Sequence, residues 1–149
     1  MRFDRPPPDP LGQALGFLLS WNGQRIARTF AEGLEPLGLR PPHFGVLSLL
    51  AAAPGQTQQA LVERSMIDPS TMVKIIDELE EFGLAERRVD PEDRRKRSIH
   101  LTAGGRKTLT RARGVAERTA EQIFAPLDER ERETLRQLLR KLSVGQADD

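Results

Sequence analysis

The sequence predicts a mainly α-helical fold with one small β-hairpin, on the basis of three observations. Apolar residues recur at steps of three, four and seven along most of the chain, which is the spacing of helices with one apolar face. Proline or glycine stands near most of the expected helix boundaries. The stretch 84–101 differs, because two short segments suited to strands flank a charged turn there.

The first third of the chain is expected to hold an arm and two helices. Residues 1–10 contain four of the eleven prolines and are predicted to be a flexible or extended arm. A long amphipathic helix is predicted over 11–38, ending near Gly33 or Gly38. The second helix, over 41–53, is mostly apolar and therefore expected to be buried. The apolar stripe of the first helix consists of Leu11, Leu15, Leu18, Leu19, Ile26, Phe30, Leu34 and Leu37.

A short helix and a longer one are expected next. The short helix is predicted over 58–65. Asp68 suits the N-cap of the longer helix, and Pro69 suits its first helical position. Gly83 stands where a C-terminal glycine ends a helix. The predicted apolar face of this helix is Met72, Ile75, Ile76, Leu79 and Phe82.

The hairpin is predicted from strands over 84–89 and 98–101, joined by the charged turn 90–97. Thr102 then caps a long helix that runs to about Ala125.

The last helix opens with Asp128 and Glu131, an acidic version of a capping box. Its leucines are expected to point inward: Leu135, Leu138, Leu139 and Leu142. One short domain cannot cover both this stripe and that of the first helix. The sequence therefore predicts an obligate dimer, with an interface of well over about 2,000 Å² in total.

Composition excludes several classes of function. The 149-residue chain has a net charge of only +1 and no cysteine, which rules out a disulfide framework and a cysteine redox switch. His43 and His100 are the only histidines and lie far apart, so neither a metal site nor a cofactor is predicted. No nucleophile elbow or phosphate-binding glycine loop is present, so no enzyme is expected. Without a long apolar segment or signal peptide, a cytoplasmic location with no membrane partner is predicted.

The order of elements predicts a helix-turn-helix followed by a wing. A helix anchored by one face presents its other face to the major groove of double-stranded DNA. A hairpin with a basic tip reaches phosphates or the minor groove. The wing contains six cations against three acids: Arg87, Arg88, Arg94, Arg95, Lys96 and Arg97. An isolated basic run is as often a solvated loop, but its place after this helix pair favours DNA.

Several motifs of this region occur at a spacing that is typical of one protein family. They are Leu79-Glu80, Gly83-Leu84, Glu86-Arg87-Arg88, Asp90-Pro91-x-Asp93-Arg94-Arg95, Leu101-Thr102 and Gly105, and upstream Gly38-Leu39-x-Pro41-Pro42 with Val46-Leu47. With these motifs the chain resembles the MarR family of bacterial transcriptional regulators. The resemblance implies an obligate homodimer, with paired winged domains on a pseudo-palindromic operator. It also implies that Asp93 orients Arg95, which enters the minor groove.

The resemblance and the patterns together divide the chain into four parts. Residues 1–10 are the arm, 11–38 the N-terminal dimerisation helix, 39–102 the winged helix-turn-helix domain, and 103–149 the C-terminal dimerisation helices. The fold class is thus a winged helix-turn-helix flanked by N- and C-terminal dimerisation helices.

The expected recognition helix departs from the family pattern. The family commonly has a hydroxyl and a basic residue where this chain has Val73 and Lys74, and a basic residue where it has Glu78. Lys74 is the only cation in 68–82, against five acids, and such a helix should be repelled by phosphate. Only its first turns are therefore expected to enter the groove. The predicted DNA contacts are Ser70, Thr71, Val73 and Lys74 in the helix, and Asp93, Arg94, Arg95, Lys96 and Arg97 in the wing.

An effector site is also implied by the resemblance, since the family's cleft between dimer helices and winged domain often binds small aromatic anions. Residues of suitable type for a small aromatic or phenolic effector are Phe17, Trp21, Arg25, His43 and Phe44. The alternative interpretation is that the aromatic residues belong to the core and His43 has a structural role.

Two hypotheses of function follow. The first is a sequence-specific regulator of transcription that binds double-stranded DNA, a repressor released by a small aromatic ligand. The second is a winged-helix module that binds an acidic protein partner instead of DNA, and the acidic recognition helix keeps it open. The sequence leaves open the operator, the target genes, the choice between repression and activation, and the identity of any effector.

Overall fold

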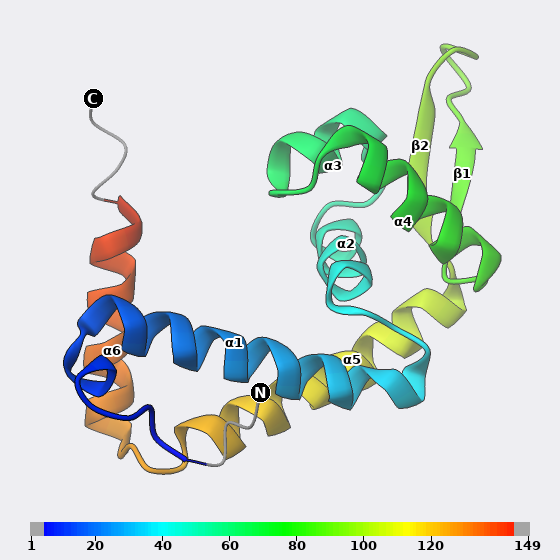
Figure 1. The fold of residues 1–149 in the computed structure, drawn as a ribbon. Helices are drawn as coiled ribbons and strands as arrows, with labels where there is room; N and C mark the ends of the chain where they lie inside the picture. The colour runs from blue at the N-terminus through cyan, green and yellow to red at the C-terminus, as the bar shows by residue number, and fades with distance from the viewer. Residues whose placement is uncertain (1–4, 145–149) are drawn as a thin grey trace.

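The computed structural model describes residues 5–144, which form six α-helices, two 3₁₀ turns and one two-stranded hairpin (Figure 1). This content confirms the predicted class, mainly α with a small hairpin. Residues 1–4 of the predicted arm and 145–149 lie outside the described residues. In chain order the elements are η1 (Leu11–Gln13), α1 (Leu15–Leu34), η2 (Glu35–Leu37), α2 (Pro41–Ala52), α3 (Gln58–Arg64), α4 (Pro69–Glu81), β1 (Ala85–Val89), β2 (Arg97–Leu101), α5 (Ala103–Phe124) and α6 (Glu129–Val144).

The winged unit and the long helices occupy different ends of the molecule (Figure 1). Helices α2, α3 and α4 and the hairpin gather at one end. Helices α1 and α5 pack along each other, and α2 also contacts α5. Helix α6 lies at the end away from the hairpin (Figure 1). No helix within residues 5–144 is long and apolar enough to cross a membrane.

The core gathers buried side chains of all the α-helices and strands except α6, with α2 and α4 as its largest contributors. Helix α2 buries Val46, Leu47 and Leu50 almost completely, as its apolar sequence predicts. Burying one such side chain contributes about 1.5–3 kcal/mol. The inner face of α4 completes the same cluster with Met72, Ile75, Ile76 and Leu79. This packing leaves the opposite face of α4 on the surface.

The hairpin register fixes where the wing projects. The strands pair antiparallel from Ala85 with Leu101 to Val89 with Arg97. The N–H of Ile99 donates to the carbonyl of Gln56 at 2.8 Å, which ties β2 to the loop before α3. Residues 90–96 therefore form the free tip, and Arg97 belongs to β2 instead of the predicted turn.

The N-terminal helix starts later than predicted. Ala14 has extended backbone angles (φ −84°, ψ 114°), so the single helix expected from Leu11 is a 3₁₀ turn followed by α1 from Leu15. Leu11 and Leu15 are four residues apart, which is helical spacing, and periodicity therefore did not reveal the break.

Three of the four α6 leucines predicted to point inward are exposed in the single chain, while Leu135 is half-buried. Leu138, Leu139 and Leu142 are 56%, 38% and 64% exposed. The N-terminal side of α1 is similarly uncovered, with Leu15 81% and Leu19 51% exposed. Apolar rows of this extent are unusual on the surface of a monomer and mark contact surfaces.

Candidate nucleic-acid interface

The N-terminus of α4 is organised by Asp68, which confirms its predicted N-cap role. Its carboxylate accepts hydrogen bonds from Ser70 Oγ and Thr71 Oγ1, both at 2.6 Å, and from the Thr71 N–H at 3.0 Å. These bonds, that of Ser70 foremost, hold the pKa of Asp68 well below its ordinary value. Because both hydroxyl protons point to Asp68, the hydroxyl oxygens have lone pairs left to accept further hydrogen bonds.

The outward face of α4 carries the four residues predicted to contact bases. Ser70, Thr71, Val73 and Lys74 are exposed, whereas Met72 between them is fully buried. They occupy the first two turns of the helix and share one surface. Contact with DNA remains a prediction for each of them.

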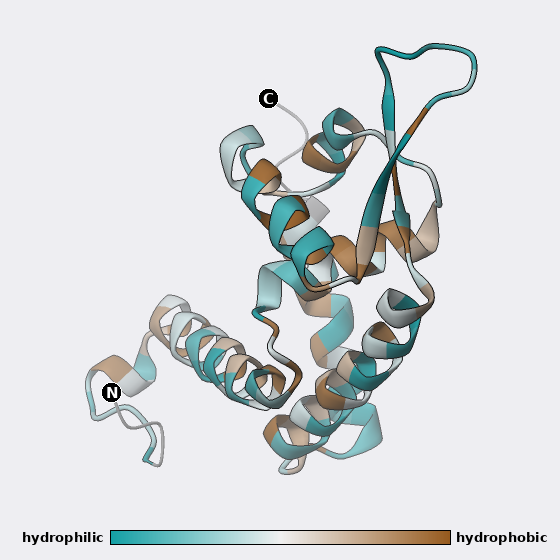
Figure 2. Ribbon diagram, turned by 90° about the vertical axis from the view of Figure 1, so that its right-hand side faces the viewer, coloured by the Kyte–Doolittle hydropathy of each residue, from teal (hydrophilic) through white to brown (hydrophobic). Residues whose placement is uncertain are grey.

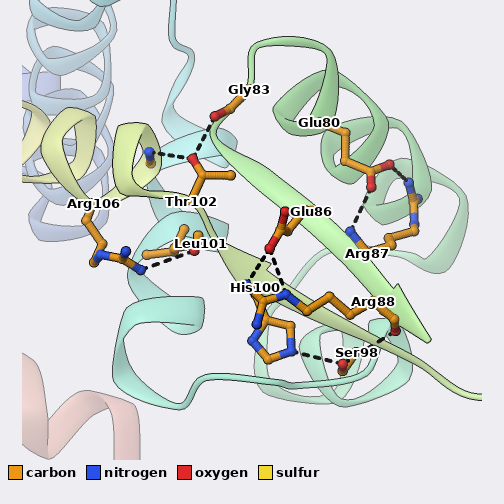
Figure 3. A network of polar contacts seen from close by, with 11 residues as sticks. Glu80, Gly83, Glu86, Arg87, Arg88, Ser98, His100, Leu101, Thr102 and Arg106 are labelled. Atoms are coloured by element: carbon orange, nitrogen blue, oxygen red, sulfur yellow. Dashed lines mark hydrogen bonds and ion pairs between the residues drawn. The ribbon is translucent and has the colours of Figure 1, made fainter. Parts of the chain in front are cut away.

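The acidic residues near the other end of α4 are paired with a cation of the hairpin. Arg87 of β1 binds Asp77 at 2.7 Å and also forms an ion pair with Glu80 (Figure 3). The Glu80 carboxylate accepts the backbone N–H of Arg87 as well, at 2.8 Å. Arg87 thus offsets one of the five negative charges that the sequence places on this helix, and it is held away from the wing tip.

Glu78 is paired in the opposite direction, toward α2. It accepts from Arg40 Nη2 at 2.5 Å and from His43 Nε2 at 2.7 Å. The hydrogen bond from His43, assisted by Arg40, lowers the pKa of Glu78. Three acids of α4 therefore have partners within the protein, which relieves the repulsion from phosphate expected from the sequence.

The wing tip is ordered by backbone hydrogen bonds. Asp93 Oδ1 accepts the backbone N–H of Arg95 at 3.0 Å, and the Lys96 N–H donates to the Asp93 carbonyl at 2.9 Å. Asp93, expected to orient Arg95, therefore contacts the backbone of Arg95 and not its guanidinium. A short Asx side chain reaches the N–H two residues later more readily than a distant guanidinium.

Arg94, Arg95 and Lys96, the wing-tip cations, are exposed at the far end of the hairpin. Figure 2 shows this tip as a hydrophilic projection beyond the rest of the fold. Arg97 donates to the Arg94 carbonyl at 2.9 Å, and Arg88 is paired with Glu86 (Figure 3). The tip thus presents three consecutive exposed cations suited to phosphate, preceded by the acids Asp90, Glu92 and Asp93.

We predict that Asp93→Asn and Asp93→Ala have opposite effects on DNA binding. Asparagine keeps an oxygen that can accept the Arg95 N–H and removes a negative charge, so affinity should stay equal or rise. Alanine loses the turn and should weaken binding about three- to tenfold, despite the same charge change. Fluorescence anisotropy with a labelled duplex measures both. Tighter binding by the alanine variant at every salt concentration would contradict the ordering role.

The base of the hairpin is anchored to α5. Thr102 Oγ1 donates to the Gly83 carbonyl at 2.6 Å and accepts the Gly105 N–H at 2.9 Å, which confirms its predicted cap (Figure 3). His100 shares a 2.9 Å hydrogen bond with Ser98. No group of three metal-ligating side chains occurs within residues 5–144.

A cavity of about 200 Å³ lies between α1, α2 and α5. Its lining is almost entirely apolar and consists of Ile26, Phe30, Phe44, Ala116, Thr119, Ala120, Ile123 and Phe124. Phe30 and Phe44 meet edge to face, with ring centroids 5.1 Å apart. A space of this size accommodates a single aromatic ring.

The five residues predicted to bind an effector are not gathered at this cavity. Only Phe44 lines it. Phe17 and Trp21 lie nearer the start of α1 and stack on each other, with ring centroids 6.0 Å apart. His43 is buried, 1% exposed, and faces Glu78.

Comparison with known proteins assigns the family. A model of the MarR family matches residues 37–96. A putative transcriptional regulatory protein for the hcr operon of Thauera aromatica is 36% identical over 129 residues, 86% of this chain and 78% of that protein. The chain belongs to the MarR family.

Solved MarR-family structures have the same fold. CouR is a transcriptional repressor, and a CouR structure from Rhodococcus jostii RHA1 is among those that match. The structure of CouR bound to a 23-mer DNA duplex superposes with a TM-score of 0.81. It is 32% identical, with 91% of this chain and 96% of that chain covered. BpsR of Bordetella bronchiseptica, whose DNA binding is regulated by 6-hydroxynicotinic acid, has a TM-score of 0.79 and 30% identity over 95% and 100% of the two chains.

The region matched by the MarR-family model contains α4 and the wing tip. Sequence reasoning missed two features beside them: the partners of the α4 acids and most of the cavity lining. Arg40 and Arg87 did have the charge needed to pair with acids, but 38 residues separate Arg40 from Glu78. The spacing of Ile26 and Phe30 placed both on the apolar face of the first helix. It did not show that α5 leaves a space beside them.

Proposed function

We propose that this MarR-family chain is a homodimeric transcriptional repressor that binds a pseudo-palindromic double-stranded operator. The observation that carries the proposal is the contrast between the two ends of the interface. Three acids of α4 are paired with Arg87, Arg40 and His43, while the wing-tip cations are exposed. The surface near the first turns of α4 is therefore compatible with phosphate, and the wing attracts it.

The dimer is supported by the uncovered leucines of α1 and α6. Two protomers that join through these rows hide their apolar surface and place two winged units on one face. A two-fold dimer matches a site with two half-sites about 10 base pairs apart. The CouR structure on a duplex supports the same function for a chain of this fold.

The hypothesis of a module that binds only protein rested on an acidic recognition helix. Arg40 and Arg87 pair with three of the acids of α4, which weakens that support.

A mobility shift with the DNA beside the protein's own gene, at 50 mM and 200 mM salt, tests the proposed function. We expect binding at low salt that weakens at least about a hundredfold at high salt, since cations on phosphates release counterions. Absence of binding at low salt to both this DNA and random duplexes would contradict the proposal.

The first turns of α4 should discriminate bases. We predict that Val73→Thr changes the preferred operator, because it adds a hydroxyl to a side chain that is 38% exposed. Lys74→Ala should weaken binding, and a contacted base is worth about 1–3 kcal/mol of discrimination. Selection of preferred duplexes from a random pool measures both. Glu81→Gln, at the exposed C-terminal end of α4, is the control that should leave the sequence logo unchanged; identical logos for all four proteins would contradict the assignment.

We further propose that a small aromatic ligand releases the repressor by entering the cavity lined by Phe44. The regulation of BpsR by 6-hydroxynicotinic acid supports this class of ligand. A panel of single-ring acids that includes salicylate and 6-hydroxynicotinate is expected to contain a compound that weakens DNA binding.

Phe44→Ala should abolish that response, because the ring lines the cavity, whereas Phe17→Ala should keep it, because Phe17 does not. Anisotropy of a labelled duplex is the readout, with the fluorescence of Trp21, the only tryptophan, as a second signal. An equal response from both variants would place the ligand elsewhere.

A further inference from the structure

His43 uses both of its ring nitrogens, one toward the N-cap of its own helix α2 and the other toward the middle of α4. Nδ1 accepts the backbone N–H of Arg40 at 2.9 Å, and Nε2 lies 2.7 Å from Glu78 Oε2. Since Nδ1 accepts, the ring proton is assigned to Nε2, which donates it to the carboxylate. The neutral imidazole thus satisfies one partner on each helix.

His43 restrains Glu78 more firmly than Arg40 does. The His43 side chain is 2% exposed, whereas that of Arg40 is 60% exposed, so water screens and competes for the arginine contact. The rings of His43 and Phe82 also pack edge to face, with centroids 5.6 Å apart. Phe82, predicted to lie on the apolar face of α4, is its C-cap residue and is 46% exposed.

The next residue along α2 faces the cavity. Phe44 lines that space and contacts Phe30 of α1. Successive side chains of a helix diverge by about 100°, so one turn of α2 touches α4 on one side and the cavity on another. A displacement of this turn by a cavity occupant therefore acts on the bond between His43 and Glu78.

We propose that His43 is a positioning residue that sets the orientation of α4 through Glu78 and couples the cavity to the DNA-binding surface. The coupling rests on the proposed function. The positioning does not, since it concerns the free protein.

Two substitutions distinguish the role of one ring nitrogen from that of the other. In His43→Gln the amide nitrogen takes the place of Nε2 and can still donate to Glu78. In His43→Asn the amide oxygen takes the place of Nδ1 and can still accept from Arg40, but nothing reaches Glu78. Each variant therefore keeps one bond and loses the other.

Hydrogen exchange of the α4 amides in the free dimer and the dissociation constant for DNA are the two readouts. Losing a hydrogen bond to a charged group changes an equilibrium constant by roughly tenfold or more. We expect His43→Asn to lower α4 protection and DNA affinity by about tenfold, and His43→Gln to stay within about threefold of wild type. Equal effects of the two variants, or none from asparagine, would overturn the positioning role.

The coupling is tested by filling the cavity covalently. Ala116 lines it and is half-buried, and Ala116→Phe adds a ring where the ligand is proposed to lie. We expect this change to weaken DNA binding at least about fivefold in wild type, and less than about twofold in the His43→Asn background. If the substitution lowered DNA affinity by the same factor in both backgrounds, the coupling would be overturned.

Ala116→Leu is the smaller substitution to use if the phenylalanine variant does not fold, with the same expected difference between backgrounds. If wild type binds no DNA at all, the proposed function fails and the coupling with it. Hydrogen exchange still decides whether His43 positions α4.

Discussion

Replacing all three wing-tip cations with alanine should lower DNA affinity at least about a hundredfold at 0.1 M salt. Arg94, Arg95 and Lys96 are exposed on each protomer, so a dimer loses six positive charges. Each phosphate contact contributes about 0.9 to the slope of log affinity against log salt. If all six contact phosphates, the slope should fall by about five units, and Arg95→Ala alone should lower it by about two.

A matched variant separates the wing from net charge. Arg111, Arg113 and Arg118 are exposed cations of α5, and replacing them removes the same charge from the same protein. That control should leave the salt slope within about one unit of wild type. If the control lost as much slope as the wing variant, the wing would only contribute to a diffuse positive field.

Glutamate at positions 138 and 142 should break the dimer and abolish DNA binding. Leu138 and Leu142 are 56% and 64% exposed in the single chain, and each buried leucine is worth about 1.5–3 kcal/mol. About 60% of each side chain is left for the dimer to bury, so four such side chains amount to at least about 3.5 kcal/mol, or more than about a hundredfold in the dissociation constant. Sedimentation at sub-micromolar concentration should show wild type as a dimer and the variant as monomeric or unfolded.

Arg140→Glu is the control for that experiment. Residue 140 lies on the side of α6 opposite Leu138, because the two positions are 200° apart on a helix of 100° per residue. This variant should remain dimeric and bind DNA. A stable, folded wild-type monomer at sub-micromolar concentration, or a dimeric double-glutamate variant, would remove α6 from the interface.

Local signals predicted the winged unit closely. The cap at Asp68, Pro69 as first helical residue and Gly83 after the helix all lie where the sequence indicates. Each depends on a few neighbouring residues whose backbone preferences are strong. Gly83 has a φ of 69°, a left-handed conformation that favours glycine.

Features that depend on contacts between distant segments were not predicted. Arg87 meets Asp77 and Glu80 only because the hairpin folds back beside α4, so the net charge of the α4 sequence overstated its acidity. Asp93 bonds to a backbone N–H rather than the guanidinium, since a two-residue offset does not say which donor is reached. The leucines of α6 were expected inward because periodicity shows that a face is apolar without showing which chain covers it.

Selection of bound duplexes from a random DNA pool by the wild-type protein tests the central claim most directly. A dimer with two α4 helices and two wings should enrich an inverted repeat whose half-sites are centred about 10 base pairs apart. The complex should contain two protomers per duplex by sedimentation. Enrichment of no sequence, or of a single half-site bound by one protomer, would contradict a dimeric, sequence-specific DNA-binding protein.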